Sequence, residues 1–113
     1  VDCYLSGWST STGDADWGLR PMLATESEPP MSYNISYYEN EKVDQLLKDG
    51  LATADEDKRD EIYAEVQDIV WQDLPLLCIS NDKNIWATSN NITGVYLLGD
   101  GSIGMRNARM AAE

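Results

Sequence analysis

A change in hydrophobic period at Asn40 constrains the fold of this chain more than any other feature of its sequence. From that point apolar residues recur at the i, i+3, i+4 and i+8 spacing of a helix with one buried stripe, namely Val43, Leu46, Leu47 and Leu51. Asn40 is a suitable N-cap because its side-chain oxygen can accept a hydrogen bond from a backbone N–H of the first turn. The pattern predicts an amphipathic helix that must bury its stripe against another element.

The sequence predicts a second helix directly after the first. Thr53 and Glu56 stand in the T-x-x-E arrangement of a capping box, and acidic residues fill the first turn, where the helix dipole favours them. Pro75 is expected to stop this helix near Asp73. A helix from Asp55 to Asp73 would be roughly 28 Å long, enough to brace a small domain. Four aliphatic residues at helical spacing are its predicted buried face: Ile62, Val66, Ile69 and Val70.

Short apolar runs predict strands on either side of the helices. Residues 3–5 form one such run before the helices. Residues 76–79 and 85–88 form two more, and the polar turn between them predicts a hairpin. Residues 94–98 predict a further extended segment. The sequence therefore predicts a fold that combines helices with a sheet.

Two cysteines and two tryptophans are expected to pack in the core. Cys3 and Cys78 fall in apolar runs, where free thiols behave as small hydrophobes, and a disulfide between them stays open as an alternative. Trp71 borders the apolar stripe of the second helix, and Trp86 lies in a predicted strand. Indoles in such positions are typical of core packing.

Composition excludes several classes of function. Eight basic residues stand against twenty acidic ones, and the net charge of -12 repels a nucleic-acid backbone. No run approaches the ~20 apolar residues that cross a bilayer. Because the chain contains no histidine, a Cys/His zinc site and a Cys–His nucleophile pair are excluded within its 113 residues. The first residue is not Met and an apolar run begins at once, so we expect a piece of a longer chain.

Candidate binding residues are concentrated in the loop that follows the first predicted strand. This loop is crowded with hydroxyls, holds two indoles and two carboxylates, and is followed by a single basic residue. Loops at strand ends commonly display binding groups on a rigid scaffold. We therefore predict a ligand cleft lined by Trp8, Ser9, Thr10, Ser11, Thr12, Asp14, Asp16, Trp17 and Arg20.

These residues also have other interpretations. Asp14 and Asp16 could serve a small hydrolase or metal-dependent enzyme, although a calcium-binding register that starts at Asp14 fails at several ligand positions. Alternatively, both carboxylates cap backbone N–H groups of the loop. Trp8 and Trp17 either wall a small polar ligand or pack in the core. Arg20 either grips a ligand carboxylate or neutralises an aspartate. A purely structural domain is a further alternative.

The order of these motifs resembles a known family. The similarity lies in a strand that ends in Gly-Trp, a loop with Gly-Asp-x-Asp before an aromatic residue, the helical segments NEKVDQLL and DEDKRDEIYAEVQDIVWQDLP, an apolar strand, and NITGVYLL. In this order they resemble the C-terminal part of peptide-binding proteins of bacterial ABC importers, the dipeptide, oligopeptide and nickel class. The resemblance runs from about Tyr4 to Leu98. Within the class, GWSTSTGDADWGLRP is most similar to the glutathione-binding members.

The resemblance implies an α/β (α+β) fold that forms part of one lobe of a two-lobed, periplasmic-binding-protein-like (type II) architecture, with a mixed sheet packed with two helices. Residues 1–98 would be a portion of the C-terminal lobe, and residues 99–113 a C-terminal return segment prone to fraying. The implied protein is not an enzyme and needs no cofactor or metal.

The implied function is that of the extracytoplasmic solute-binding component of an ABC importer. It would bind glutathione or a short peptide and deliver it to the permease subunits, in the periplasm or outside the cell. The remaining lobe of the same protein would complete the site. Contact with the membrane would run only through the permease or through a lipid anchor outside this segment.

One position departs from the pattern of the family. Many peptide binders of the class carry an Asp shortly after Gly-Trp, where it meets the α-amino group of the peptide. Ser11 stands at that position here, whereas Asp14 and Asp16 match a later Asp-x-Asp whose place is more structural. The departure suits a glutathione-like or otherwise modified ligand, and it shifts the emphasis of the predicted site to Trp8 and residues 9–12.

Overall fold

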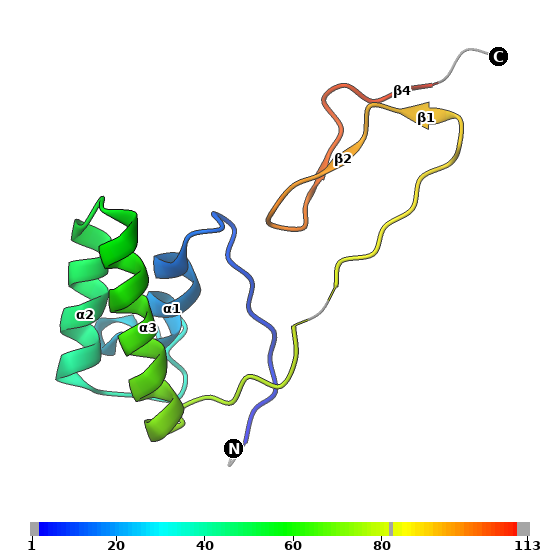
Figure 1. Ribbon diagram of the computed structural model, residues 1–113. Helices are drawn as coiled ribbons and strands as arrows, with labels where there is room; N and C mark the ends of the chain where they lie inside the picture. The colour runs from blue at the N-terminus through cyan, green and yellow to red at the C-terminus, as the bar shows by residue number, and fades with distance from the viewer. Residues whose placement is uncertain (1–2, 82, 111–113) are drawn as a thin grey trace. The chain divides into compact units, whose positions relative to one another are not determined.

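The protein divides into two compact units, residues 1–78 and residues 79–113. The computed structural model describes residues 3–81 and 83–110 of the chain. The first unit is helical and the second contains short strands (Figure 1). The structure therefore belongs to the α+β class, as predicted.

Three α-helices and one short 3-10 helix form the first unit: α1 (Ala15–Leu23), η1 (Thr25–Ser27), α2 (Glu41–Ala52) and α3 (Glu56–Asp73). Helices α2 and α3 lie side by side and run in opposite directions, and α1 packs against α2 (Figure 1). The two helices predicted from periodicity are confirmed. Helix α1 is a full helix in a region where the sequence predicts a loop and a single helical turn.

The apolar stripe of α2 forms the centre of the core. Val43 and Leu47 are fully buried. They belong to one cluster with Val66 and Val70 of α3 and Leu23 at the end of α1. Full burial of such a side chain contributes about 1.5–3 kcal/mol to stability. The predicted faces are therefore confirmed at their centres, but the prediction is wrong for Leu51, which is 56% exposed at the end of α2, and it missed Tyr63, which is buried on α3.

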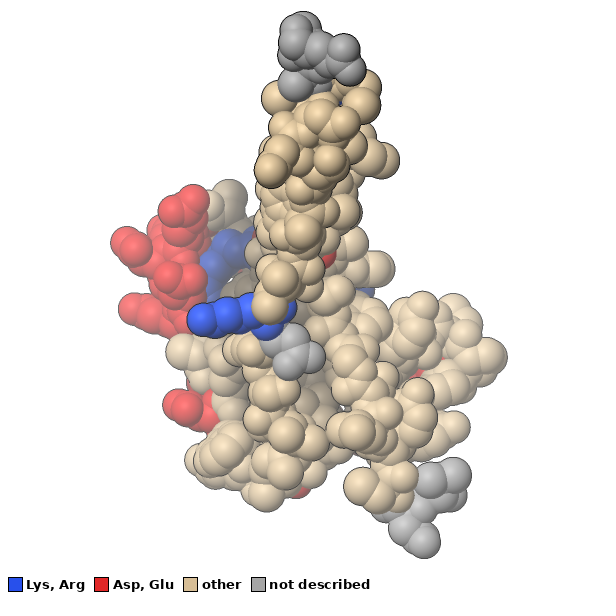
Figure 2. Space-filling view, turned by 90° about the vertical axis from the view of Figure 1, so that its right-hand side faces the viewer, with Lys and Arg blue, Asp and Glu red and all other residues tan. Residues whose placement is uncertain are grey.

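Acidic residues cover the outer surfaces of these helices. They are most frequent between residues 39 and 73, and on the face shown in Figure 2 they gather in one area while uncharged residues cover most of the rest. Lys42 of α2 forms an ion pair with Glu65 of α3 across the outer surface. Exposed pairs of this kind contribute about 0–1 kcal/mol. Apolar burial, rather than charge pairing, therefore holds α2 to α3.

The helix caps agree with the prediction at one helix and correct it at the other. Asn40 Oδ1 accepts the backbone N–H groups of Lys42 and Val43, as expected. At α3 the N-cap is Asp55, whose Oδ1 accepts the N–H of Lys58, and the predicted capping box at Thr53 is wrong. Thr53 is instead the C-cap of α2, so the chain needs two more residues before it can turn into α3.

A buried asparagine organises the irregular connection between α1 and α2. Asn34 is fully buried. Its Nδ2 donates to the carbonyl oxygens of Ala24 and Tyr38, and its Oδ1 accepts from the Tyr38 N–H and the Ser36 hydroxyl. A buried polar side chain is tolerated only when its hydrogen bonds are made. Asn34 meets that condition and joins the connection to the end of α1.

Three predicted strands do not form in the described residues. Residues 3–5, 76–79 and 85–88 belong to no strand, and Asp82, in the predicted hairpin turn, lies outside the described residues. The side chains of Leu5 and Ile85 are 79% and 91% exposed. β-propensity reflects packing on a paired, half-buried surface, and within residues 3–81 and 83–110 these segments pair with no neighbouring strand that would provide one.

The expected core positions of the cysteines and of Trp71 are also wrong. Cys3 and Cys78 are free and exposed. Trp71 is 66% exposed because it follows Val70 by one position, about 100° around the helix from the buried stripe. Trp86 lies in no strand and is 37% exposed.

Four two-residue strands occur in the second unit: β1 (Ile92–Thr93), β2 (Tyr96–Leu97), β3 (Ile103–Gly104) and β4 (Arg109–Met110). Strand β2 pairs with β3 and β1 with β4, both antiparallel, so the extended segment predicted at 94–98 is confirmed at β2. The predicted mixed sheet is wrong for the described residues. Both pairs are antiparallel because the chain reverses between β2 and β3, and the same reversal brings β4 back alongside β1.

The turn between β2 and β3 is held by one carboxylate. Asp100 Oδ1 accepts both the N–H and the hydroxyl of Ser102, and these bonds lower the pKa of Asp100. Gly101 has a φ of 83°, a conformation that favours glycine. The strands that return at 103–104 and 109–110 are not predicted by the sequence pattern.

Replacing a glycine inside a helix by alanine normally stabilises the helix by about 1 kcal/mol. We expect Gly50→Ala to destabilise the protein instead. A Cβ at position 50 would lie 2.8 Å from Cζ of the buried Tyr63 ring. Gly18→Ala in α1 is the matched control. A Cβ there meets nothing within 4 Å, so this change should stabilise by up to about 1 kcal/mol. In urea unfolding, a Gly50→Ala variant more stable than wild type would contradict the packing.

Tyr38 ties the segment before α2 to the last residue of α3. The Tyr38 hydroxyl donates to Asp73 Oδ2 over 2.5 Å, and Asn40 Nδ2 donates to the same oxygen over 3.0 Å. Burial, together with the hydrogen bond to Asp73, raises the pKa of Tyr38 to about 12.

The free energy of unfolding should therefore fall as the pH rises from about 10 to about 12. In this window the unfolded chain loses the Tyr38 proton while the folded chain keeps it, and below about pH 10 both states keep it. Tyr38→Phe should flatten this fall. The difference in ultraviolet absorbance between wild type and variant should show a phenol that ionises near pH 12, and ionisation near pH 10 would contradict the assignment.

Candidate functional site

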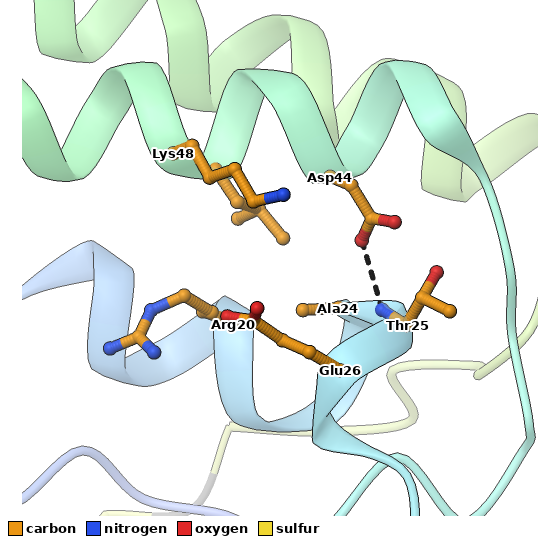
Figure 3. Close-up of a pocket in the computed structure, with 7 residues that line it drawn as sticks. Arg20, Ala24, Thr25, Glu26, Asp44 and Lys48 are labelled. Carbon is orange, nitrogen blue, oxygen red and sulfur yellow. Dashed lines mark hydrogen bonds between the residues drawn. The ribbon is translucent and has the colours of Figure 1, made fainter.

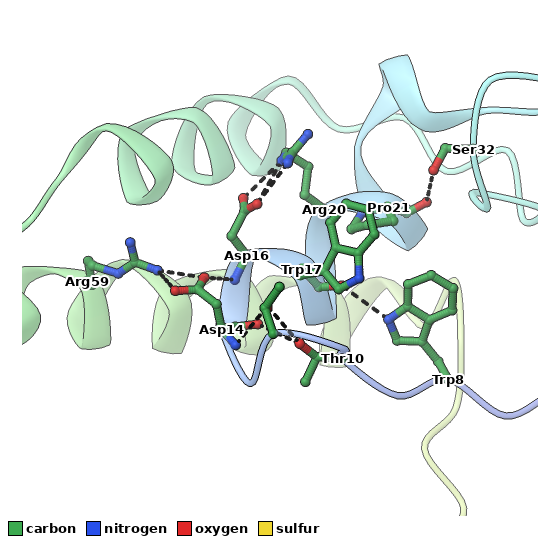
Figure 4. Close-up of polar contacts among 10 residues, drawn as sticks. Trp8, Thr10, Asp14, Asp16, Trp17, Arg20, Pro21, Ser32 and Arg59 are labelled. Atoms are coloured by element: carbon green, nitrogen blue, oxygen red, sulfur yellow. Dashed lines mark hydrogen bonds and ion pairs between the residues drawn. The ribbon is translucent and has the colours of Figure 1, made fainter. Parts of the chain in front are cut away.

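The predicted site lies on the segment that leads into α1 and on α1 itself, which carries Asp16, Trp17 and Arg20 (Figure 4). Asp14 is the N-cap of this helix, and its Oδ1 accepts the N–H of Asp16 over 2.8 Å. Gly13 has a φ of 73°, which lets the chain turn into the helix. Asp16 therefore lies in the first helical turn, where the dipole favours a negative charge, and not in the loop.

Asp16 is buried and is neutralised by Arg20. Arg20 donates from Nε to Oδ1 and from Nη2 to Oδ2, both over 2.9 Å, one helical turn along α1 (Figure 4). This hydrogen-bonded pair raises the pKa of Arg20. A buried carboxylate is tolerated when it is paired in this way. Of the two interpretations left open for Arg20, the structure shows neutralisation of an aspartate.

Asp14 is paired with an arginine that the sequence did not suggest. Arg59 Nη2 of α3 lies 2.8 Å from both carboxylate oxygens of Asp14, and its guanidinium stands 5.4 Å from the centre of the Tyr63 ring. The pair ties the start of α1 to α3 across 45 positions of sequence. Nothing in the local pattern identifies Arg59, although two carboxylates beside a single nearby arginine leave one in need of a distant partner.

Two of the loop hydroxyls hold the loop itself. Thr10 Oγ1 donates to the carbonyl oxygen of Asp14 and accepts the N–H of Gly13. Thr12 Oγ1 accepts the N–H of Asp14 and lies 3.2 Å from Thr10 Oγ1. Thr10 and Thr12 are thus committed to the turn before α1.

The other two hydroxyls are open to solvent. Ser9 and Ser11 are exposed, and their side chains make no hydrogen bond within residues 3–81 and 83–110. They flank Thr10, which faces the turn. An alternation of this kind is expected where a chain is extended, because successive side chains point to opposite sides. The loop therefore offers two free donor–acceptor groups.

Of the two indoles of the site, Trp8 is hydrogen-bonded within the protein and Trp17 is open to solvent. Trp8 Nε1 donates to the carbonyl oxygen of Trp17 over 3.3 Å (Figure 4). The Trp8 ring also lies 4.9 Å from that of Tyr33 at an angle of 54°. Trp8 thus fastens the loop to α1. Trp17 is 40% exposed, and its Nε1 makes no hydrogen bond to the part of the chain that the structure describes. Tyr33 was not among the predicted residues, and no local signal marks it.

The geometry gives no support to the enzyme alternative. Each carboxylate of the Asp14 and Asp16 pair is engaged by its own arginine, so neither is free to act as a general acid, a base or a metal ligand. Among the described residues, no group of three or more Cys, Asp or Glu could hold a metal ion. The loop-capping interpretation is confirmed for Asp14, which caps the N–H of Asp16, whereas the Asp16 carboxylate pairs with the Arg20 side chain instead of a backbone N–H.

Comparison with known proteins finds relatives among bacterial binding proteins. No family model matches the chain. Glutathione-binding protein GsiB from Pectobacterium atrosepticum is 38% identical over 100 residues, which cover 88% of this chain and 20% of that protein. The proteins of the same name from Escherichia coli K12 and Shigella flexneri are 36% identical over 108 residues, covering 96% of this chain and 21% of theirs.

The chain is homologous to one region of bacterial glutathione-binding proteins. The resemblance predicted from the sequence is thereby confirmed. The chain spans about a fifth of the length of these relatives. These relatives are named for binding and not for a reaction. None of the helices in the described residues has the length and hydropathy of a membrane span.

We expect Asp16→Asn to destabilise the protein by about 2–3 kcal/mol, because it leaves Arg20 without its buried counter-charge. Asp14→Asn is the matched control. Asparagine is an equally good N-cap, and the lost pair with Arg59 is partly exposed, so the cost should stay below about 1 kcal/mol. Urea unfolding measures both, and equal costs would show that the Asp16–Arg20 pair has no special role.

Proposed function

We propose that this chain is a portion of the C-terminal lobe of a two-lobed, type II solute-binding protein. In this proposal the protein binds glutathione or a short peptide outside the cytoplasm and delivers it to the permease subunits of an ABC importer. The observation that carries the proposal is homology to glutathione-binding proteins over 96% of the chain.

Within the predicted site, we assign ligand contact to Ser9, Ser11 and Trp17. Ser9 and Ser11 on the loop and Trp17 in the first turn of α1 have exposed side chains that make no hydrogen bond within the described residues. Glutathione presents two carboxylates, an ammonium group and two amides, all of which can exchange hydrogen bonds with hydroxyls and an indole N–H. The other predicted residues would then act by holding the loop still, which supports a preorganised site.

The second lobe would close over this loop. Ligand pockets are concave and lie preferentially between domains, and the loop by itself is an open surface. Closure would be a hinge motion favoured by contacts that exist only when ligand is bound. The proposed location is the periplasm or the exterior of the cell envelope. Attachment to the membrane would run through the permease or a lipid anchor outside this segment.

The test uses the full-length protein and glutathione in calorimetry. Ser11→Ala and Trp17→Ala should each weaken binding, by about threefold to tenfold for the hydroxyl and by tenfold or more for the indole, while the melting temperature changes little. Trp71→Ala removes an exposed indole from α3 and is the matched control, with affinity unchanged. Unchanged affinity in both loop variants would show that the loop is not the site.

A second outcome is expected for the 113-residue chain alone. Because much of the pocket would belong to the other lobe, the isolated chain should bind glutathione weakly or not at all. A micromolar dissociation constant for the isolated chain would contradict the two-lobed site.

A further inference from the structure

A small cavity of about 280 Å³ lies between α2 on one side and the end of α1 with η1 on the other (Figure 3). Its apolar wall is formed by Ala24 and Leu47, which are 3% and 1% exposed. Its remaining lining is charged and polar. Apart from Arg20, it shares no residue with the proposed glutathione site.

Two of the polar groups in the cavity are already committed. Arg20 is held by Asp16, as described above. Asp44 Oδ1 accepts the N–H of Thr25 over 2.9 Å, the contact drawn in Figure 3. This bond caps the start of η1 from α2 and leaves the second oxygen of Asp44 without a protein donor among the described residues.

Two opposite charges in the cavity form no ion pair among the described residues, although the Glu26 carboxylate is close enough to Arg20 to contribute to its raised pKa. Lys48 of α2 and Glu26 of η1 both line it. In the described part of the chain, neither side chain makes an ion pair or a hydrogen bond, with the other or with any third residue. Opposite charges on two sides of a pocket would attract a ligand that carries both signs.

We propose that this cavity binds a small zwitterion, a single α-amino acid with an apolar side chain. The ligand carboxylate pairs with Lys48, and its ammonium group with Glu26 and the free oxygen of Asp44. The side chain packs against Ala24 and Leu47. The volume lies just below the range of pockets that hold drug-sized ligands, which fits one amino acid and not a tripeptide. The site goes beyond the proposed glutathione function and does not depend on it.

L-Valine and two analogues test the charge requirement on the 113-residue chain. Isovaleric acid keeps the carboxylate and isobutylamine keeps the ammonium group, each with a valine-like side chain. We expect valine to bind with a dissociation constant of about 1 mM, typical of a small exposed site, and both analogues to bind at least tenfold more weakly. Backbone amide shifts in NMR should change at Thr25 and Lys48.

Variants that remove a single charge test whether Lys48 and Glu26 bind the ligand. Lys48→Met and Glu26→Gln should each weaken valine binding at least tenfold. Lys58→Met and Glu61→Gln remove the same charges from α3, outside the cavity, and should leave it unchanged. Because all four side chains are exposed, the variants should fold, which circular dichroism verifies.

Several results would overturn the site. The proposal fails if valine does not bind at 10 mM or if isovaleric acid binds as tightly as valine. It also fails if the NMR shifts are confined to amides other than those of Thr25 and Lys48, or if Lys48→Met leaves the affinity for valine unchanged. Unchanged glutathione binding by the full-length Lys48→Met variant is expected, so failure at this cavity and failure of the proposed function are separate outcomes.

Discussion

Burial of the α2 stripe against α3 is the interaction on which the helical unit depends. Val43 and Leu47 have almost no exposed surface, and among the described residues they form one buried cluster with residues of α1, its C-cap and α3. The helices themselves are short and carry a strongly acidic outer surface, so their own helical propensity would not keep them folded. Tertiary packing along one stripe therefore fixes the positions of α1, the loop before it and the cavity beside α2.

Charge pairing has a different role, because it sets the local geometry of the site. The two aspartates are close in sequence, but one is paired along α1 and the other across to α3. The loop before α1 is held to α3 through Asp14 and to α1 through Trp8, and its threonines close the turn. What remains available on the loop is a small set of uncharged groups. Such a surface suits a ligand that is recognised by hydrogen bonds and by an aromatic face.

Local periodicity was sufficient to predict α2 and α3, because their buried faces repeat within the helices themselves. The site was predicted only as a group. The sequence placed Thr10, Asp14 and Ser11 together, yet it did not distinguish residues that hold the loop from residues that remain open. That distinction depends on Arg59 and Tyr33, which are remote in sequence. The predicted strands failed for a related reason, since a strand requires a partner and an apolar run does not specify one.

The burial of Asn34 has a consequence for producing this protein in a eukaryotic secretory host. Asn34-Ile-Ser36 and Asn91-Ile-Thr93 both match the acceptor sequence for N-linked glycans. Asn91 is exposed and could carry a glycan on the folded protein. The Asn34 amide nitrogen is used in hydrogen bonds to Ala24 and Tyr38 inside the protein. A sugar attached there during synthesis would block the connection from closing onto α1, so one acceptor would be harmless and the other would prevent folding.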